Sequence, residues 1–216
     1  MTKKECLSCS DCGVYNCFRQ EKEFPPFCLT TQGNEEDLAE AVKLYQGKGL
    51  TAKMARAAAE IEGTYYGRLT RVEEIIQFAK RIGAKKIGIA SCVGLIQETK
   101  VFCRILEAKG LESYSVLCKV GSVDKTEIGI PEELKVAKGC FEGICNPVLQ
   151  AKVLNRQKTD LNVINELCVG HDSLFIKYSK APVTSLITKD RVTGHNPAAP
   201  LYTSGFYYKR LLEEEK

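Results

Sequence analysis

Beyond residue 85, apolar positions alternate between two kinds of pattern. Short apolar runs at 86–91, 113–120, 161–167 and 183–188 have the length and composition of strands. Between them, apolar residues recur at helical spacing at 95–109, 147–157 and 171–178. Strands that alternate with helices predict a parallel sheet with right-handed crossovers. We therefore expect residues 85–216 to form a small, mainly parallel, Rossmann-like three-layer α/β domain with helices on both faces of the sheet.

The segment 34–84 has helical periodicity throughout. Acidic residues at 35–37 open a helix that reaches Tyr45, and an alanine-rich helix follows from an N-cap at Thr51 to about Ile61. A third helix is predicted over 70–81, with Gly83 as its stop. We expect this helical segment to pack on the α/β core. Residues 196–216 are predicted to form a loop followed by a terminal helix.

Residues 1–33 are polar and rich in cysteine. Pro25 and Pro26 cannot lie inside a helix, so an extended turn is expected there. With little apolar content to form a core, this segment is predicted to be an arm organised by a metal or a cluster. The cysteines of the arm are Cys6, Cys9, Cys12, Cys17 and Cys28.

The spacing in the arm favours one shared centre. Cys6, Cys9 and Cys12 form a CxxCxxC run, which is typical of [4Fe–4S] sites with a fourth thiolate supplied from elsewhere. Structural zinc more often uses two separated CxxC pairs, although Cys12 and Cys17 could serve as a loose second pair. We expect an iron–sulfur cluster, with Zn²⁺ as the alternative. The spacing does not decide whether Cys17 or Cys28 is the fourth ligand.

Composition narrows the classes of function. The chain has 31 basic and 27 acidic residues, a net charge of +4, and the basic residues form no stripe that would bind a phosphate backbone. No uncharged apolar stretch approaches the length that spans a bilayer, and no signal sequence follows Met1. We therefore expect a cytoplasmic protein that binds neither nucleic acid nor membrane. In a reducing compartment its eleven cysteines would remain free thiols or metal ligands.

A second group of cysteines follows the predicted strands. Cys92 follows the first strand, Cys118 lies near the end of the second and Cys168 follows the third, while Cys140 and Cys145 precede a predicted helix. Open parallel sheets bind ligands outside the carboxyl ends of their strands. These five residues are therefore predicted to hold a cofactor. Cys103, inside a helical pattern, is expected to be a core residue instead.

Three residues are candidates for catalysis. Cys145 stands just before Pro147 at a predicted helix start, where backbone N–H groups stabilise a thiolate. The two histidines of the chain, His171 and His195, fall in or beside predicted strand-end loops. Each could ligate a metal or transfer a proton. The chain has no GxGxxG, phosphate-loop or GxSxG motif, so nucleotide binding and serine hydrolase chemistry are not indicated.

Several motifs together resemble a known family. These are the arm's cysteine run and the segments Ile89–Gly94, Gly143–Pro147, Cys168–Phe175 and Gly194–Tyr202. The combination resembles an uncharacterised domain-of-unknown-function family of cysteine-rich proteins from anaerobic bacteria and archaea that carries a metal-binding label. The resemblance implies an anaerobic setting, which favours oxygen-sensitive clusters over zinc. It supplies no reaction and no catalytic residues.

The sequence therefore predicts an iron–sulfur redox metalloprotein, in which the arm's cluster passes electrons to a second cysteine-ligated centre at the strand ends. An iron–sulfur oxidoreductase is one form of this prediction. The partner would be a redox protein or a small-molecule substrate. Two alternatives remain open: a zinc-stabilised protein that binds a metal or sulfur without redox catalysis, and an enzyme with a cysteine nucleophile.

Overall fold

The computed structural model describes residues 6–214 and divides the chain into two compact units. The first runs through Arg56 and the second begins at Ala57, so the division falls within helix α4 (Leu50–Tyr65). The predicted boundaries at residues 33 and 84 do not coincide with it. One reason is that helix α5 (Arg71–Ile82) belongs with the sheet, because Arg71 donates hydrogen bonds to the Ser185 carbonyl and the Thr184 hydroxyl.

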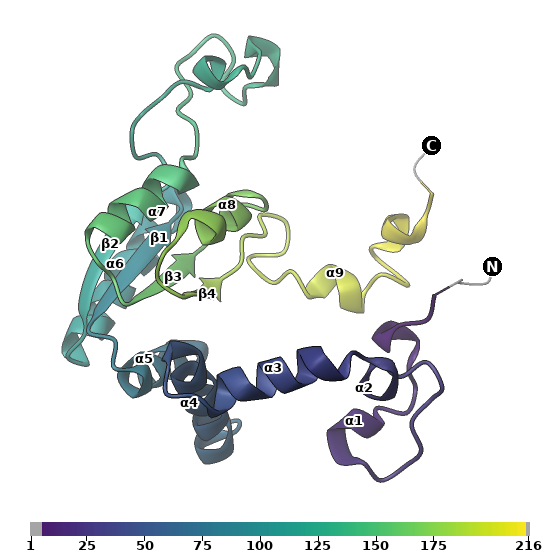
Figure 1. The fold of residues 1–216 in the computed structure, drawn as a ribbon. Helices are drawn as coiled ribbons and strands as arrows, with labels where there is room; N and C mark the ends of the chain where they lie inside the picture. Colours follow the sequence, from purple (N-terminus) through teal and green to yellow (C-terminus); the bar gives the residue numbers. More distant parts are fainter. Residues whose placement is uncertain (1–5, 215–216) are drawn as a thin grey trace. The chain divides into compact units, whose positions relative to one another are not determined.

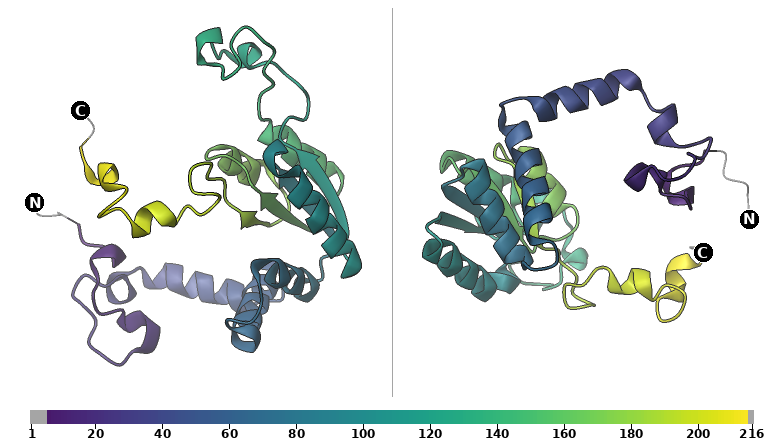
Figure 2. Two further views of the ribbon diagram at one scale, coloured as in Figure 1. Left: turned by 180° about the vertical axis from the view of Figure 1, so that it is seen from behind. Right: turned by 90° about the horizontal axis from the view of Figure 1, so that it is seen from below.

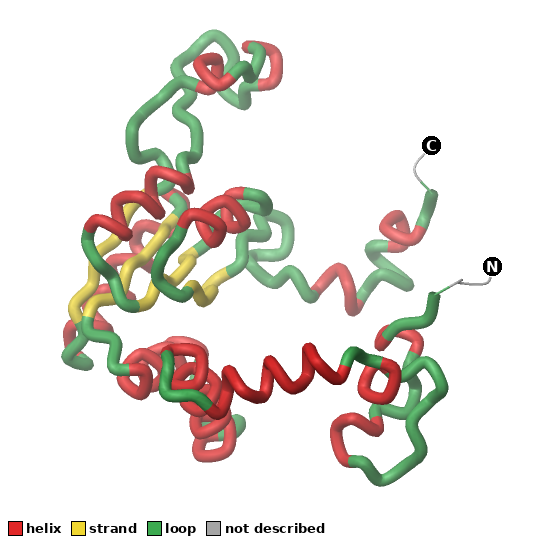
Figure 3. The backbone as a smooth tube through the Cα atoms, viewed as in Figure 1, coloured by secondary structure: helices red, strands yellow, loops and turns green. Residues whose placement is uncertain are grey.

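The second unit is built on a four-stranded parallel sheet in the order β2-β1-β3-β4. Figures 1 and 3 show the strands side by side. Their bounds are β1 Lys86–Ser91, β2 Glu112–Leu117, β3 Leu161–Asn165 and β4 Val183–Ile187. The central strands β1 and β3 are almost wholly buried, as expected for near-continuous apolar runs covered on both faces. The predicted parallel α/β fold is confirmed.

Helices cover both faces of this sheet (Figure 2). On one face α6 (Ile96–Ala108) lies against β1, where the Thr99 hydroxyl is hydrogen-bonded to that of Ser91. On the other face α7 (Pro147–Arg156) and α8 (His171–Tyr178) pack on a buried cluster. This cluster consists of Ala90, Cys92, Val116, Cys118, Ala151, Leu154, Ile164, Leu167 and Phe175.

Local sequence signals fix the start and end of α5. Thr70 and Glu73 form a capping box, in which each side chain accepts a hydrogen bond from the other residue's backbone N–H. Gly83 adopts φ 82° and ends the helix in the left-handed conformation that glycine favours. The helix predicted over 70–81 is confirmed, and its apolar face buries Ile75, Ile76, Ala79 and Ile82.

The connection from β2 to α7 is long and protrudes from the sheet (Figure 1). It contains 3-10 turns at Lys125–Ile128 and Glu132–Leu134 and an antiparallel bridge between Asp124 and Gly143. Ion pairs join Lys135 to Asp124 and Glu132, both at 2.8 Å. The connection is therefore ordered by polar contacts rather than by an apolar core.

The first unit consists of short elements and one longer helix. A 3-10 turn at Cys9–Asp11 and the helices α1 (Asn16–Arg19) and α2 (Leu29–Gln32) precede α3 (Glu35–Gln46). Asn34 caps α3 through its side chain. The expected N-cap at Thr51 was wrong, because α4 begins at Leu50 and Thr51 lies inside the helix.

The chain ends in two short helical elements. These are α9 (Ala199–Tyr202) and a 3-10 turn at Lys209–Leu212. Within the described residues, no helix is long and apolar enough to cross a membrane.

Candidate functional site

The topological switch point of the sheet lies between β1 and β3, because β2 and β4 extend it to opposite sides. Ligands of open parallel sheets bind at this point, outside the carboxyl ends of the strands. Each strand delivers one polar residue there. Cys92, Cys118 and Glu166 immediately follow β1, β2 and β3, and Lys189 stands two residues beyond β4.

Three of the predicted thiols come together at this edge. Cys118 is hydrogen-bonded to both Cys92 and Cys145, and Cys145 packs against the buried cluster that contains the other two. We call Cys92, Cys118 and Cys145 the strand-end cluster. Backbone N–H groups also point at its sulfurs. Val93 N–H donates to Cys118 Sγ at 3.4 Å and Gly94 N–H to Cys92 Sγ at 3.5 Å.

The three thiols differ in acidity. Hydrogen bonds from Cys118 to Cys145 and Cys92, together with burial, raise the pKa of the Cys118 thiol. The same hydrogen bond lowers the pKa of Cys92 to about 5, with further help from Gly94 N–H and from Lys189. Cys118 is therefore the thiol that keeps its proton, and its single S–H can donate to Cys92 or to Cys145, but not to both at once.

Cys145 has its own cationic neighbours. The hydrogen bond from Cys118 lowers its pKa to about 5, and the charges of Lys119 and His171 act in the same direction. Lys119 is fixed in place because its Nζ donates to the Gly143 carbonyl at 2.5 Å. The predicted catalytic residue His171, the first residue of α8, thus lies near Cys145.

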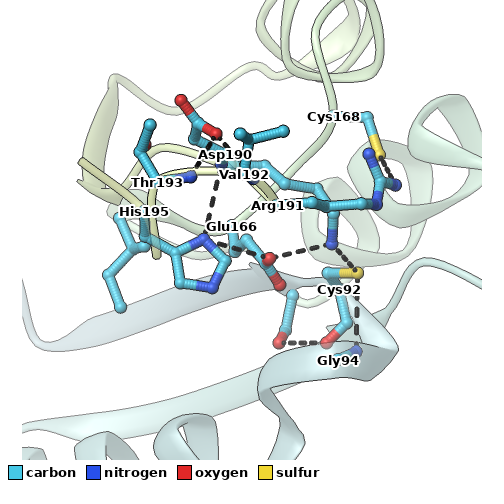
Figure 4. A network of polar contacts seen from close by, with 12 residues as sticks. Cys92, Gly94, Glu166, Cys168, Asp190, Arg191, Val192, Thr193 and His195 are labelled. Carbon is cyan, nitrogen blue, oxygen red and sulfur yellow. Dashed lines mark hydrogen bonds and ion pairs between the residues drawn. The ribbon is translucent and has the colours of Figure 1, made fainter. Parts of the chain in front are cut away.

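A buried ion pair adjoins Cys92. Lys189 Nζ lies 3.1 Å from Cys92 Sγ and 2.8 Å from Glu166 Oε1. His195 Nδ1 is 3.3 Å from the same carboxylate oxygen and 3.4 Å from Asp190 N (Figure 4). Nδ1 can accept from Asp190 or donate to Glu166, but not both at once. The second predicted histidine therefore contacts Glu166 rather than a thiol.

Cys168 lies beside this network but has a different partner. Its sulfur accepts a hydrogen bond from Arg191 at 3.1 Å, and Figure 4 shows the guanidinium between Cys168 and the neighbourhood of Cys92. Arg191 is exposed, and its charge also interacts with Cys92 and Glu166. Each of Cys92, Cys145 and Cys168 thus has its own basic side chain.

The remaining cysteines lie elsewhere. Cys140 is exposed in the β2–α7 connection, where its carbonyl accepts from Lys135 Nζ at 3.2 Å. In the arm, Cys6, Cys9 and Cys17 are exposed, and Cys12 and Cys28 are half-buried. Cys103, expected in the core, is also half-buried and lines a surface pocket on α6. Across residues 6–214, no three His, Cys, Asp or Glu side chains are placed to hold a metal ion, and this includes the three thiols of the strand-end cluster.

A family model described as a protein of unknown function, DUF1847, matches residues 28–186. The chain belongs to the DUF1847 family. The matched residues include the strand-end cluster and end before Lys189. The description names no metal, so the metal-binding part of the resemblance stays a prediction.

The DUF1847 chain is also similar to an uncharacterized protein of Methanocaldococcus jannaschii. The two are 47% identical over 186 residues, which cover 86% of this chain and 94% of that protein. No solved structure matches the chain. These likenesses establish the family and assign no activity.

Four residues of this DUF1847 site were not predicted: Lys119, Glu166, Lys189 and Arg191. Glu166 was included in the third predicted strand, although a carboxylate at the end of an apolar run is itself a signal of a strand-end site. The basic residues gave no comparable signal. Lys189 and Arg191 contact their cysteines only because separate strands end at the same edge, and Lys119 lies near Cys145 because the β2–α7 connection returns to that edge.

Proposed function

We propose that this chain is a redox metalloprotein that holds an iron–sulfur cluster on the strand-end cluster. One observation carries the proposal: three thiols from three separate segments meet at the switch point of the sheet. Two of them, Cys92 and Cys145, lie beside the basic residues Lys189 and Lys119. Thiolates are the ligands that iron–sulfur clusters require.

The donors around the sulfurs favour a cluster over a single zinc ion. Lysine ammonium groups beside the ligands would oppose the binding of a dication, whereas cysteine-ligated clusters are anionic and accept N–H···S hydrogen bonds. Val93 N–H, Gly94 N–H and Lys189 Nζ already point at Cys118 and Cys92. The donor set therefore fits an anionic cluster.

Cys168 is the candidate for a fourth ligand. Its sulfur accepts a hydrogen bond from Arg191 rather than from one of the other thiols. Cys168 would either bind the fourth iron of the cluster or leave that iron open to a substrate. An open iron supplies Lewis-acid chemistry as well as electron transfer. The arm's Cys6, Cys9 and Cys12, together with Cys17 or Cys28, would hold the second cluster that passes electrons to this one.

Anaerobic reconstitution with iron and sulfide tests the proposal. We expect the wild-type protein to bind both and to show visible absorbance and an electron paramagnetic resonance signal after reduction. Replacing Cys92 and Cys145 together with serine should remove one cluster's iron and sulfide. Cys103→Ser, which alters a thiol on α6, is the matched control. Full iron and sulfide in the double variant, or bound zinc without sulfide, would overturn the proposal.

A cysteine nucleophile is the second candidate function, because His171 lies close enough to Cys145 to interact with it electrostatically. In that case metal-free protein would form covalent adducts with electrophilic acyl probes at Cys145. His171→Ala would slow this reaction, and the strand-end cysteines would bind no iron.

A further inference from the structure

We propose that Glu166 is a positioning residue, which holds the Lys189 ammonium group against the Cys92 sulfur. This fixed positive charge would make Cys92 more reactive and would raise the reduction potential of the strand-end centre. The effect on the potential rests on the proposed function, whereas the reactivity of Cys92 does not depend on any metal.

Two contacts link the Glu166 carboxylate to the Lys189 ammonium group and that ammonium group to the Cys92 sulfur. Glu166 Oε1 binds Lys189 Nζ at 2.8 Å, and the same Nζ lies 3.1 Å from Cys92 Sγ. The Glu166 side chain is 2% exposed and that of Lys189 is 7% exposed. In such an environment an ion pair is screened weakly, so the charge acts strongly on a sulfur that it touches.

The position of Glu166 follows from the topology. Its N–H donates to the Ile187 carbonyl at the end of β4, and Cys92 N–H donates to the Asn165 carbonyl at the end of β3. Glu166 and Cys92 are therefore the first residues beyond the two central strands. They face each other at the point where this architecture places its ligands.

The backbone at this position is strained. Glu166 has φ 64° and its contact His195 has φ 67°, both in the left-handed region that non-glycine residues rarely adopt. Strain of this kind persists where the surrounding structure enforces it and is concentrated at functional sites.

Stability does not explain the ion pair either. Buried ion pairs often contribute no more to folding than apolar side chains of the same size. Here one carboxylate oxygen, Glu166 Oε2, is buried without a hydrogen-bond partner in the described part of the chain. An unpaired buried oxygen is unfavourable, so the carboxylate fits a role at the site better than a role in the core.

The side chains of Glu166, Cys92 and Lys189 all approach the same point beside Gly94. A Cβ built on this glycine would lie 3.4 Å from Glu166 Oε2 and 3.8 Å from both Cys92 Sγ and Lys189 Nζ. Gly94 is exposed, so this place lies at the surface of the site. Cys92 itself is 7% exposed, so the side beside Gly94 is where a small reagent would have to reach its sulfur.

The first test measures, in metal-free protein, the rate at which iodoacetamide modifies Cys92 at one fixed pH, chosen so that the wild-type thiol is half ionised. Mass spectrometry of the Cys92 peptide follows the reaction. Lys189→Met should slow the reaction about fivefold or more, and Lys189→Arg should retain most of the rate. Glu166→Gln should also slow it. Lys152→Met, on the exposed side of α7, is the matched control and should leave the rate unchanged.

The direction of the Glu166→Gln effect separates positioning from simple electrostatics. Removing a negative charge by itself would stabilise the Cys92 thiolate and speed its modification. Releasing Lys189 would do the opposite. If Glu166 acts through Lys189, the double variant Glu166→Gln, Lys189→Met should react at the rate of Lys189→Met alone. Faster modification in Glu166→Gln, or additive effects, would overturn the proposal.

The second test measures the midpoint potential of the reconstituted centre. Lys189→Met and Glu166→Gln should both shift it to more negative values, because the first removes the positive charge beside the Cys92 sulfur and the second releases that charge from its fixed position. A protein that binds no cluster refutes the proposed function and leaves the alkylation test of Glu166 intact. If Glu166→Gln does not fold, unchanged alkylation in Lys189→Met is sufficient to overturn the proposal.

Discussion

At the scale of single residues, Cys118 determines how the strand-end thiols ionise. It is buried, and its one S–H can donate a hydrogen bond to either Cys92 or Cys145. The consequence is that two neighbouring sulfurs share one donor. This arrangement makes Cys118 the residue whose removal should affect both of the others.

We predict that Cys118→Ala raises the pKa of Cys92 and of Cys145 from their values of about 5. A thiol with a lowered pKa is ionised above that value, so the pH midpoint of alkylation in metal-free protein should move upward when the donor is lost. Iodoacetamide labelling followed by peptide mass spectrometry measures both midpoints. Cys103→Ala is the control, and unchanged midpoints in Cys118→Ala would contradict the prediction.

At the scale of elements, the β2–α7 connection links two of the clustered thiols, Cys118 and Cys145. Its base is closed by the hydrogen bond from Ile144 N–H to the Val123 carbonyl. Asp124 holds it through a 2.8 Å ion pair with Lys135. Hydrogen bonds from Lys135 and from backbone N–H groups lower the pKa of the Asp124 carboxyl group below its usual range.

A lowered carboxyl pKa gives the sign of the pH dependence. The contribution of Asp124 should be present above about pH 4, the value for an unfolded chain, and should be lost as the pH falls through the lower folded value. We predict that acidification through this range loosens the connection. Hydrogen exchange of the Ile144 and Lys125 amides, corrected for intrinsic rates, measures the change.

A substitution at neutral pH isolates the same carboxylate. Asp124→Asn should increase exchange at these amides on the order of tenfold, because hydrogen bonds to a charged group are weakened. Glu107→Gln, on the exposed side of α6, is the control. Equal protection in Asp124→Asn and in the wild-type protein would show that the connection is held by other contacts.

At the scale of the whole molecule, the chain has two separate sets of cysteines. One set is in the arm and the other is at the edge of the sheet, and they belong to different compact units. A redox function with two centres requires that each set binds its own metal. The two sets can therefore be removed independently.

We predict that replacing Cys6 and Cys9 with serine lowers bound metal by one whole site and loosens the arm, while the strand-end centre stays loaded. The arm has too few buried apolar residues to fold by burial alone, so metal binding would supply its stability. Metal analysis and limited proteolysis check the two effects. A double variant with full metal content would show that the arm is not a metal site.

Much of the second unit could be predicted from the sequence, because the relevant information is local. The apolar run at 86–91 has the period and length of a buried strand, and β1 has these bounds. Thr70 and Gly83 set the ends of α5 through hydrogen bonds within a few residues. The rule that ligands gather at strand ends then placed Cys92 and Cys118 correctly at the edge of the sheet.

The tertiary structure decided which side chains meet at that edge. Lys189 reaches Glu166 and Cys92 only because β4 pairs with β3 and β3 with β1, an order that local periodicity does not contain. The tertiary structure also separates Cys140 from Cys145, although they are five positions apart in the sequence. The β2–α7 connection, which carries Cys140, protrudes from the sheet and then returns to α7. The sequence by itself determined the elements and which cysteines stand at the strand ends, since periodicity and residue type are local properties. The pairing of charges with thiols depends on strand order and packing, which only the folded chain specifies.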